Sequence, residues 1–301
     1  MALAYLSGLL QGDTRSLARC ISLVENEAPG YEQLLQALPH RTNTRVVGIT
    51  GPPGAGKSTL VNALISQLLL QQQKVAILAV DPSSPFNYGA LLGDRIRMSR
   101  HFNHPDVYIR SLATRGALGG LSPKIIEISE VVKAAGFDYL FIETVGVGQS
   151  EVEIAGIADT TVVVVVPEAG DEIQTMKAGL MEIADIFVVN KADRDQADLF
   201  ARNLRTLAHT RSGDWNIPVI KTIATQEEGV KALIEQIQLH QRGIYSHEQR
   251  HALLLAEKAY QLIQQRRMRD ISRQALQQEV LKRLQDGDFN LYRLAAEWAG
   301  R

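Results

Sequence analysis

The stretch GITGPPGAGKSTL, residues 48–60, decides the fold of this chain. It contains the pattern G-x-x-x-x-G-K-[ST] from Gly51 to Ser58, between a β-branched run and a run with helical spacing. Glycines in such a loop let successive backbone N–H groups turn towards bound phosphates, and the following helix adds the positive end of its dipole. The stretch therefore predicts a P-loop that binds the phosphates of a nucleotide.

Two side chains of this loop carry specific chemistry. Lys57 can reach the β- and γ-phosphates, which makes it a catalytic candidate, and the Ser58 hydroxyl can ligate magnesium. The residues predicted to hold the nucleotide phosphates are Gly51, Pro52, Pro53, Gly54, Ala55, Gly56, Lys57, Ser58 and Thr59.

Short β-branched runs alternate with amphipathic helical stretches over the middle of the chain. The predicted strands are residues 45–50, 74–80, 106–112, 138–143, 160–166, 185–190 and 218–223. This alternation predicts an α/β fold of the P-loop NTPase type, with a mostly parallel sheet flanked by helices. Helical spacing in residues 1–40 and 244–301 predicts an N-terminal and a C-terminal helical extension on either side of a nucleotide-binding domain at 41–243.

Composition places the chain among ordinary soluble globular proteins. It has 301 residues, 45% hydrophobic and 22% charged, with a formal net charge of -1. A protein that binds nucleic acid would normally show a basic excess, so we expect no nucleic-acid partner. Arg266, Arg267 and Arg269 form a small basic cluster that is typical of a solvated helix face.

Membrane insertion and disulfide bonding are not expected. The longest apolar run, residues 160–167, is too short to span a bilayer, and the N-terminal stretch lacks the basic region of a signal peptide. Cys20 is the only cysteine, so no intrachain disulfide can form. We therefore expect a cytoplasmic protein in a reducing compartment.

The sequence NKAD, residues 190–193, follows another apolar run and predicts recognition of guanine. The carboxylate of Asp193 can accept hydrogen bonds from the N1–H and the exocyclic amine of guanine, whereas adenine offers neither donor. Asn190 would brace the loop or meet the base edge, and the stem of Lys191 can cover the plane of the ring. The motif therefore favours GTP over ATP.

The stretch TIAT, residues 222–225, follows the last predicted strand and is the expected second contact with the base. In GTPases this region usually contains serine and alanine, and a backbone N–H meets guanine O6. Ile223 stands where the serine is usual, so the backbone contact survives while a side-chain brace is lost. The predicted nucleotide contacts here are Ile223, Ala224 and Thr225.

Acidic side chains at predicted strand ends supply candidates for magnesium binding. Asp81 ends one predicted strand and Asp94 begins a predicted helix, and either could bind the ion directly or through water. Glu143 ends the predicted strand beside that of the P-loop, where it could hold a magnesium-bound water.

The residues after Glu143 predict a switch loop, ETVGVGQSE (143–151). Gly146 can present its N–H to the γ-phosphate, and Gly148 gives the loop freedom to move when that contact is lost.

These motifs, together with AVDPSSP, LLGDRIRM, TRGALGG and GDEIQTMKAGLMEIAD, occur in an order that resembles the MeaB/ArgK family of GTPases. The resemblance covers most of residues 45–230. Two departures are Ala117, where the family often has histidine, and a somewhat short C-terminus.

The resemblance implies an accessory role to an adenosylcobalamin-dependent mutase of the methylmalonyl-CoA mutase type. The GTP state would gate cofactor loading and protect the mutase, and intrinsic hydrolysis would be slow and stimulated by the mutase. Gln174 and Lys177 match family positions that swing towards the nucleotide when the partner docks. The candidate catalytic residues besides Lys57 are Glu143, Gln149 and Lys177. The family also implies a homodimer formed through the C-terminal helices.

Three alternatives stay open on sequence grounds. A metal-insertion GTPase of the same class would need clustered soft or imidazole ligands, for which His101 and His104 are the only close histidine pair. A kinase linked to amino-acid transport would normally favour ATP and lack N-K-x-D. A pure nucleotide-binding module would bind GTP without useful turnover.

Overall fold

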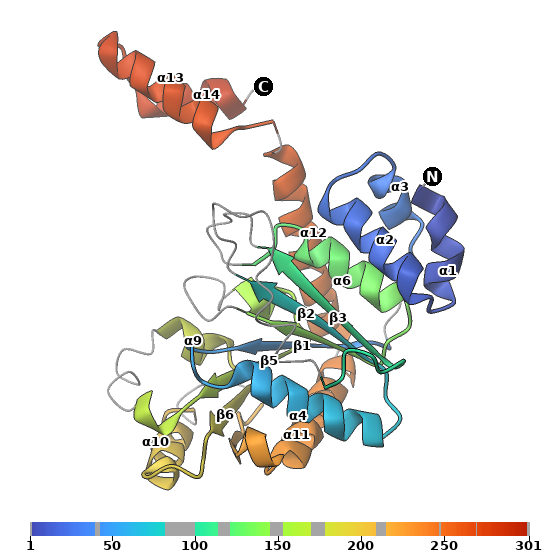
Figure 1. The fold of residues 1–301 in the computed structure, drawn as a ribbon. Coiled ribbons are helices and arrows are strands. Elements are labelled where there is room, and N and C mark those ends of the chain that lie inside the picture. The colour runs from blue at the N-terminus through green and yellow to red at the C-terminus, as the bar shows by residue number, and fades with distance from the viewer. Residues whose placement is uncertain are drawn as a thin grey trace. The chain divides into compact units, whose positions relative to one another are not determined.

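The structure is a computed structural model of the 301-residue chain, and it describes residues 2–39, 43–81, 100–113, 121–144, 153–169, 178–208, 215–246, 248–268 and 270–299 (Figure 1). Its centre is a sheet with the strand order β3-β2-β4-β1-β5-β6-β7. The strands are β1 (Arg45–Thr50), β2 (Val75–Asp81), β3 (Val107–Ala113), β4 (Tyr139–Glu143), β5 (Thr160–Val165), β6 (Ile186–Asn190) and β7 (Val219–Thr222). Every strand pair is parallel, which confirms the predicted α/β fold.

Helices cover the sheet and extend from both ends of the chain. The α-helices of the described residues are α1 (Leu6–Leu10), α2 (Thr14–Glu25), α3 (Tyr31–Gln36), α4 (Lys57–Leu70), α6 (Ile125–Ala134), α9 (Ala178–Ile183), α10 (Ala197–Ala208), α11 (Val230–Ser246), α12 (Glu248–Arg267), α13 (Arg273–Gln285) and α14 (Leu291–Ala299). Short 3-10 helices are η1 (Ala2–Tyr5), η2 (Ile154–Gly156), η3 (Pro167–Ala169) and η4 (Ala224–Gln226).

The alternation of side chains along β5 explains why both faces of the sheet are covered. Val162 and Val164 join a core with apolar residues of α4 and α11, whereas Val163 and Val165 join a second core with residues of α9 and α10. Successive side chains of a strand point to opposite faces, so a run of valines must be buried on both. The apolar run at 160–167 is therefore an interior strand, β5, followed by Val166 and Pro167.

The N-terminal helices form a layer against α6, on the far side of that helix from the sheet (Figure 1). Leu17 and Ile21 of α2 are fully or almost fully buried in this layer. Two ion pairs fasten it to the sheet domain: Arg110 of β3 to Glu25 at 2.8 Å, and Lys124 to Glu27 at 2.7 Å. The predicted N-terminal helical stretch is thus a packed part of the protein.

The chain divides into two compact units, Met1–Leu254 and Leu255–Arg301. Helix α11 continues through Gly243 to Ser246, so the sequence-based boundary at residues 243–244 lies inside a helix. A glycine within a helix costs only about 1 kcal/mol, which tertiary contacts readily offset.

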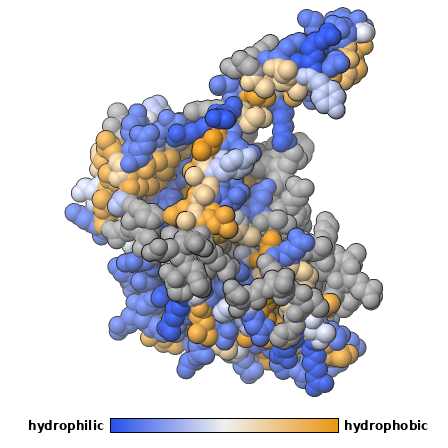
Figure 2. Space-filling view, turned by 180° about the vertical axis from the view of Figure 1, so that it is seen from behind, coloured by the Kyte–Doolittle hydropathy of each residue, from blue (hydrophilic) through white to orange (hydrophobic). Residues whose placement is uncertain are grey.

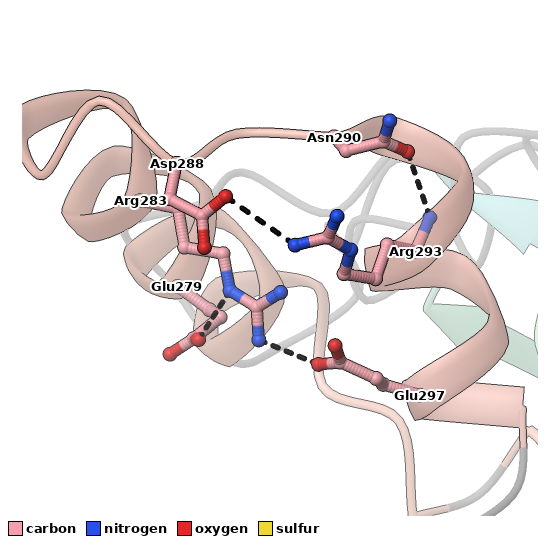
Figure 3. Close-up of polar contacts among 6 residues, drawn as sticks. All are labelled: Glu279, Arg283, Asp288, Asn290, Arg293 and Glu297. Atoms are coloured by element: carbon pink, nitrogen blue, oxygen red, sulfur yellow. Dashed lines mark hydrogen bonds and ion pairs between the residues drawn. The ribbon is translucent and has the colours of Figure 1, made fainter.

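The second unit contains a helical hairpin of α13 and α14 that is joined by charged side chains (Figure 3). Arg283 of α13 donates to Glu279 at 2.8 Å and to Glu297 of α14 at 2.6 Å. The side chain of Asn290 accepts from the backbone N–H of Arg293 at 3.0 Å and caps α14. Helix α14 lies within the predicted C-terminal helical extension, and its ordering contacts come from α13.

No helix among the described residues is both long enough and apolar enough to cross a bilayer.

Candidate functional site

The P-loop connects β1 to α4 at the carboxyl edge of the sheet, where its three glycines adopt positive φ. The φ angles are 133° at Gly51, 77° at Gly54 and 87° at Gly56. L-residues with a side chain rarely adopt such angles, so the loop conformation requires glycine. Within the loop, Ala55 is buried while Pro53 and Gly54 are exposed, and Thr59 is exposed on the first turn of α4.

Two of these glycines also permit close packing against neighbouring strands. A Cβ atom at Gly51 would lie closer than 3.0 Å to the carbonyl oxygen of Val164 in β5. A Cβ at Gly56 would lie closer than 3.0 Å to the side-chain amide nitrogen of Asn190, at the end of β6. The P-loop is therefore seated directly on the ends of β5 and β6.

The side chain of Lys57 folds back over the loop. Its ammonium donates to the carbonyl oxygens of Gly51 at 2.7 Å and Pro52 at 3.1 Å, and the residue is only 6% exposed. These bonds hold the ammonium of Lys57 over the loop. A bound phosphate is a stronger acceptor than a backbone carbonyl, so phosphate oxygens would replace the two carbonyl oxygens as acceptors. The geometry is compatible with the predicted role of Lys57.

The hydroxyl of Ser58 donates to Oε1 of Glu143 at 2.6 Å, and both residues are buried. Strand β4 places this carboxylate, since Glu143 is paired in register with Ile49 of β1, two residues before the P-loop. A hydroxyl has one donor and two lone pairs, so donation to Glu143 leaves the serine oxygen able to ligate a cation. Hydroxyl and carboxylate oxygens are the ligands that magnesium prefers, so the residues present fit the ion.

The side chain of Asn190 joins three loops at the base end of the site. Its amide nitrogen donates to the carbonyl oxygen of Ala55 at 2.9 Å, and its oxygen accepts from the Thr222 hydroxyl at 3.0 Å and from the Ala224 N–H at 3.2 Å. These bonds brace the loops, and a contact of Asn190 with the base edge stays a prediction. Thr222 begins the TIAT stretch but was not among its predicted contacts, although its position at the end of β7 could have indicated a role.

Lys191 and Asp193 extend from the end of β6 beside the P-loop. Lys191 has a φ of 56°, and its ammonium donates to the carbonyl oxygen of Gly54 at 2.8 Å. Asp193 is exposed. An exposed carboxylate is accessible to a ligand, and the contact of Asp193 with guanine stays a prediction.

Residues 223–225 form the neighbouring loop and the start of η4. The N–H of Ile223 donates to the carbonyl oxygen of Glu228 at 3.1 Å, and that of Ala224 donates to Asn190. Thr225 is the second residue of η4, and the first N–H groups of a helix have no partner within it. The contacts of Ile223, Ala224 and Thr225 with a base stay predictions.

Several predicted site residues lie outside the described residues. These are Asp94, Gly146, Gln149, Gln174 and Lys177. The backbone of Asp81 ends β2, which pairs with β4, so it reaches the same sheet edge as Glu143; its side chain is outside the description.

The histidine pair considered for a metal site has other partners. The ring nitrogen Nε2 of His101 lies 3.1 Å from the Ser66 hydroxyl, and Nδ1 of His104 accepts from the Asp106 N–H at 3.2 Å. Cys20 is buried in the N-terminal layer, and burial raises the pKa of its thiol to about 11. Among the residues that the structure describes, no three His, Cys, Asp or Glu side chains gather into a metal site.

Comparisons with known proteins agree on one family. A family model described as "Methylmalonyl Co-A mutase-associated GTPase MeaB" matches residues 17–284. A protein of Pyrococcus horikoshii named as a GTPase is 50% identical over 241 residues, which cover 78% of this chain and 76% of that protein. The GTPase ArgK of Escherichia coli is 39% identical over 233 residues, covering 74% and 70%.

A solved structure titled as a LAO/AO transport system kinase has the same fold over nearly the whole chain. Its TM-score is 0.71 with 26% sequence identity, and the match covers 99% of this chain and 96% of that one.

The seating of the P-loop predicts different effects for two glycine substitutions. Gly54→Ala meets no atom within 4 Å, so it should lower the free energy of unfolding only by the strain of positive φ, about 1–2 kcal/mol. Gly56→Ala adds a clash with Asn190 and should cost about 1–3 kcal/mol more. Urea denaturation of both nucleotide-free variants measures this difference, and equal stabilities would show that the P-loop does not rest on Asn190.

Proposed function

The chain belongs to the MeaB family of GTPases and hydrolyses GTP, and on that premise we propose that it is a magnesium-dependent accessory protein of an adenosylcobalamin-dependent acyl-CoA mutase. The observation that carries the nucleotide part is the braced pair of loops at Asn190 and the P-loop, joined by a 2.9 Å hydrogen bond. This bond fixes the spacing between the phosphate end and the base end of one nucleotide site.

We propose that Asp193 selects guanine. Its exposed carboxylate follows Asn190 by three residues, and Asn190 is held by bonds to two other loops. Two hydrogen bonds to guanine would be lost with adenine, leaving the carboxylate unpaired against the base. Lys191 would cover the ring, and a backbone N–H within residues 223–225 would meet guanine O6.

At the phosphate end, Lys57 and the N–H groups of the P-loop would hold the β- and γ-phosphates. Ser58 would ligate magnesium while donating to Glu143, with Asp81 and Asp94 as further candidates for the ion. Magnesium supplies neutralisation of phosphate charge when it is bound. Gly146 and Gln149 would respond to the γ-phosphate from the segment that follows Glu143.

The mutase partnership rests on the family description and on the segment that contains Gln174 and Lys177. We propose that docking of the mutase brings Lys177 towards the phosphates, so that hydrolysis is slow until the partner binds. A cation that arrives only in the docked state acts as an arginine finger does. The GTP state would thereby gate cofactor loading and protection of the mutase.

Because Cys20 is buried and unable to pair within the chain, we place this activity in the cytoplasm.

We further propose that the chain forms a homodimer through its C-terminal helices, with residues 1–40 and 41–243 forming the helical extension and the GTPase domain. The second unit exposes large apolar side chains among hydrophilic ones (Figure 2). They include Leu281 at 53%, Leu284 at 55% and Tyr292 at 84% exposed. Clusters of exposed apolar residues are typical of interaction surfaces, and two identical surfaces can cover each other.

Guanine selection predicts an altered nucleotide preference for Asp193→Asn. The asparagine amide can donate to the O2 oxygen of xanthine, so GTP affinity should fall about ten- to hundredfold while affinity for xanthosine triphosphate rises. Calorimetry with both nucleotides measures the change. Asp195→Asn, an exposed aspartate two residues away, is the matched control and should keep the wild-type preference. A mutant that still prefers GTP by the wild-type ratio contradicts the assignment.

The mutase partnership predicts that a methylmalonyl-CoA mutase accelerates GTP hydrolysis by this protein. Lys177→Ala should retain slow basal turnover but lose most of the acceleration, whereas Lys231→Ala, an exposed lysine on α11, should be stimulated normally. Phosphate release with and without the mutase measures both. If the mutase never accelerates the wild type, the partnership is wrong; if it accelerates Lys177→Ala fully, only the role of Lys177 is wrong.

The dimer proposal predicts that wild-type protein sediments as a dimer at micromolar concentration. The double variant Leu284→Asp/Tyr292→Asp should sediment as a monomer, because charges would be buried without partners. Leu199→Asp, a residue of α10 that is 56% exposed, is the control and should stay dimeric. Sedimentation velocity decides, and a monomeric wild type overturns the proposal.

A further inference from the structure

Two buried threonines join the end of β4 to the end of β1. The hydroxyl of Thr144 donates to the hydroxyl oxygen of Thr50 at 2.9 Å, and the two residues are 2% and 0% exposed. Thr50 is the last residue of β1, directly before Gly51, and Thr144 directly follows Glu143. The bond therefore links the residue that enters the P-loop to the residue from which segment 145–150 departs.

This contact lies on the opposite face of the sheet from Ser58. Tyr139 and Phe141 of β4 belong to the core beneath α4, so the alternation of side chains puts Glu143 on that face and Thr144 on the other. Glu143 is held there by Ser58. The end of β4 is thus attached on both faces, through Glu143 to α4 and through Thr144 to β1.

The main-chain pairing of β4 with β1 and β2 reaches Glu143. The last main-chain bond of the pair runs from the N–H of Thr144 to the carbonyl oxygen of Ile49, at 3.0 Å. Strand ends lack the next ladder bond, so a side-chain bond at that point restricts rotation of the final peptide unit. That rotation would turn Glu143 away from Ser58.

We propose that Thr50 and Thr144 are positioning residues for GTP hydrolysis, which fix the Glu143 carboxylate and the departure point of segment 145–150 relative to the P-loop. They act through Glu143 and touch neither nucleotide nor metal. The role rests on the GTPase activity of this site and is independent of any mutase. Nucleotide affinity depends mainly on the P-loop and the base-binding loops, so the pair should affect turnover more than binding.

The test is a set of four variants, assayed without a partner protein. Thr144→Val and Thr50→Val each remove one hydroxyl at nearly constant shape. Each should lower kcat about tenfold, while GDP affinity changes by less than about twofold, since geometry at the reacting end is what is lost. Thr144→Ser keeps the hydroxyl and should restore most of kcat. The double variant Thr50→Val/Thr144→Val should be no slower than either single variant, because both remove the same bond.

Stability separates positioning from a purely structural role. Each single Thr→Val variant leaves the other threonine with a buried hydroxyl that has lost its partner, whereas the double variant has neither hydroxyl. The urea midpoint of the double variant should therefore return towards the wild-type value. Its kcat should stay low. Thr44→Val is the matched control: Thr44 is 3% exposed and donates to the carbonyl oxygen of Phe137 at 2.7 Å, at the opposite end of the same strand pair. It should lose stability and keep the wild-type kcat.

Several outcomes overturn the proposal. They are a wild-type kcat in Thr144→Val, a kcat that recovers together with stability in the double variant, and a GDP affinity that falls by the same factor as kcat. Failure of Thr144→Val to fold leaves Thr50→Val, Thr144→Ser and the double variant to decide. Absence of hydrolysis by the wild type would instead contradict the GTPase assignment itself.

Discussion

The close approach of the P-loop backbone to β5 and β6 is the constraint on which the nucleotide site depends. Gly51 rests on the carbonyl of Val164 and Gly56 on the amide of Asn190, and neither position has room for a Cβ atom. The loop is thereby fixed by strands that come later in the chain. A loop seated in this way pre-forms its N–H cradle, so little conformational entropy remains to be lost when phosphates bind.

The two ends of the site are held by polar side chains of different kinds. At the base end, Asn190 uses both its amide nitrogen and its oxygen to tie the P-loop to the loop after β7. At the phosphate end, Ser58 donates one short hydrogen bond to Glu143, and the bond between Thr144 and Thr50 joins the end of β4 to the end of β1. Buried polar groups paired in this manner are stable and directional, which suits groups that must keep fixed positions around a ligand.

The N-terminal and C-terminal helices differ in how they are stabilised. The N-terminal helices bury Leu17 and Ile21 and are fastened by Arg110 and Lys124, so they act as an additional layer of that domain. In the C-terminal unit, charged pairs around Arg283 join α13 to α14, while large apolar side chains stay exposed. Such a hairpin keeps its own form and still offers apolar surface for association.

The sequence by itself determined the features that depend on local spacing. The β-branched runs predicted the seven strands that the described residues form. The positions at which the P-loop and NKAD motifs would bind phosphates and base stay predictions. Spacing could not determine that Asn190 would be a brace, that Ser58 would be the partner of Glu143, or that Thr50 would meet Thr144. Those contacts join residues 85 to 135 positions apart. They exist because the strand order places β4 and β5 beside β1 and β6 beside β5. The motifs predicted that the strand of Glu143 lies beside the P-loop strand, but no local pattern encodes the rest of the order or the side-chain pairs that it creates. The helical spacing of residues 244–301 predicted the helical character of α14 but not its contact with α13. A nine-residue helix is marginal alone, and this one is stabilised by Arg283 from α13.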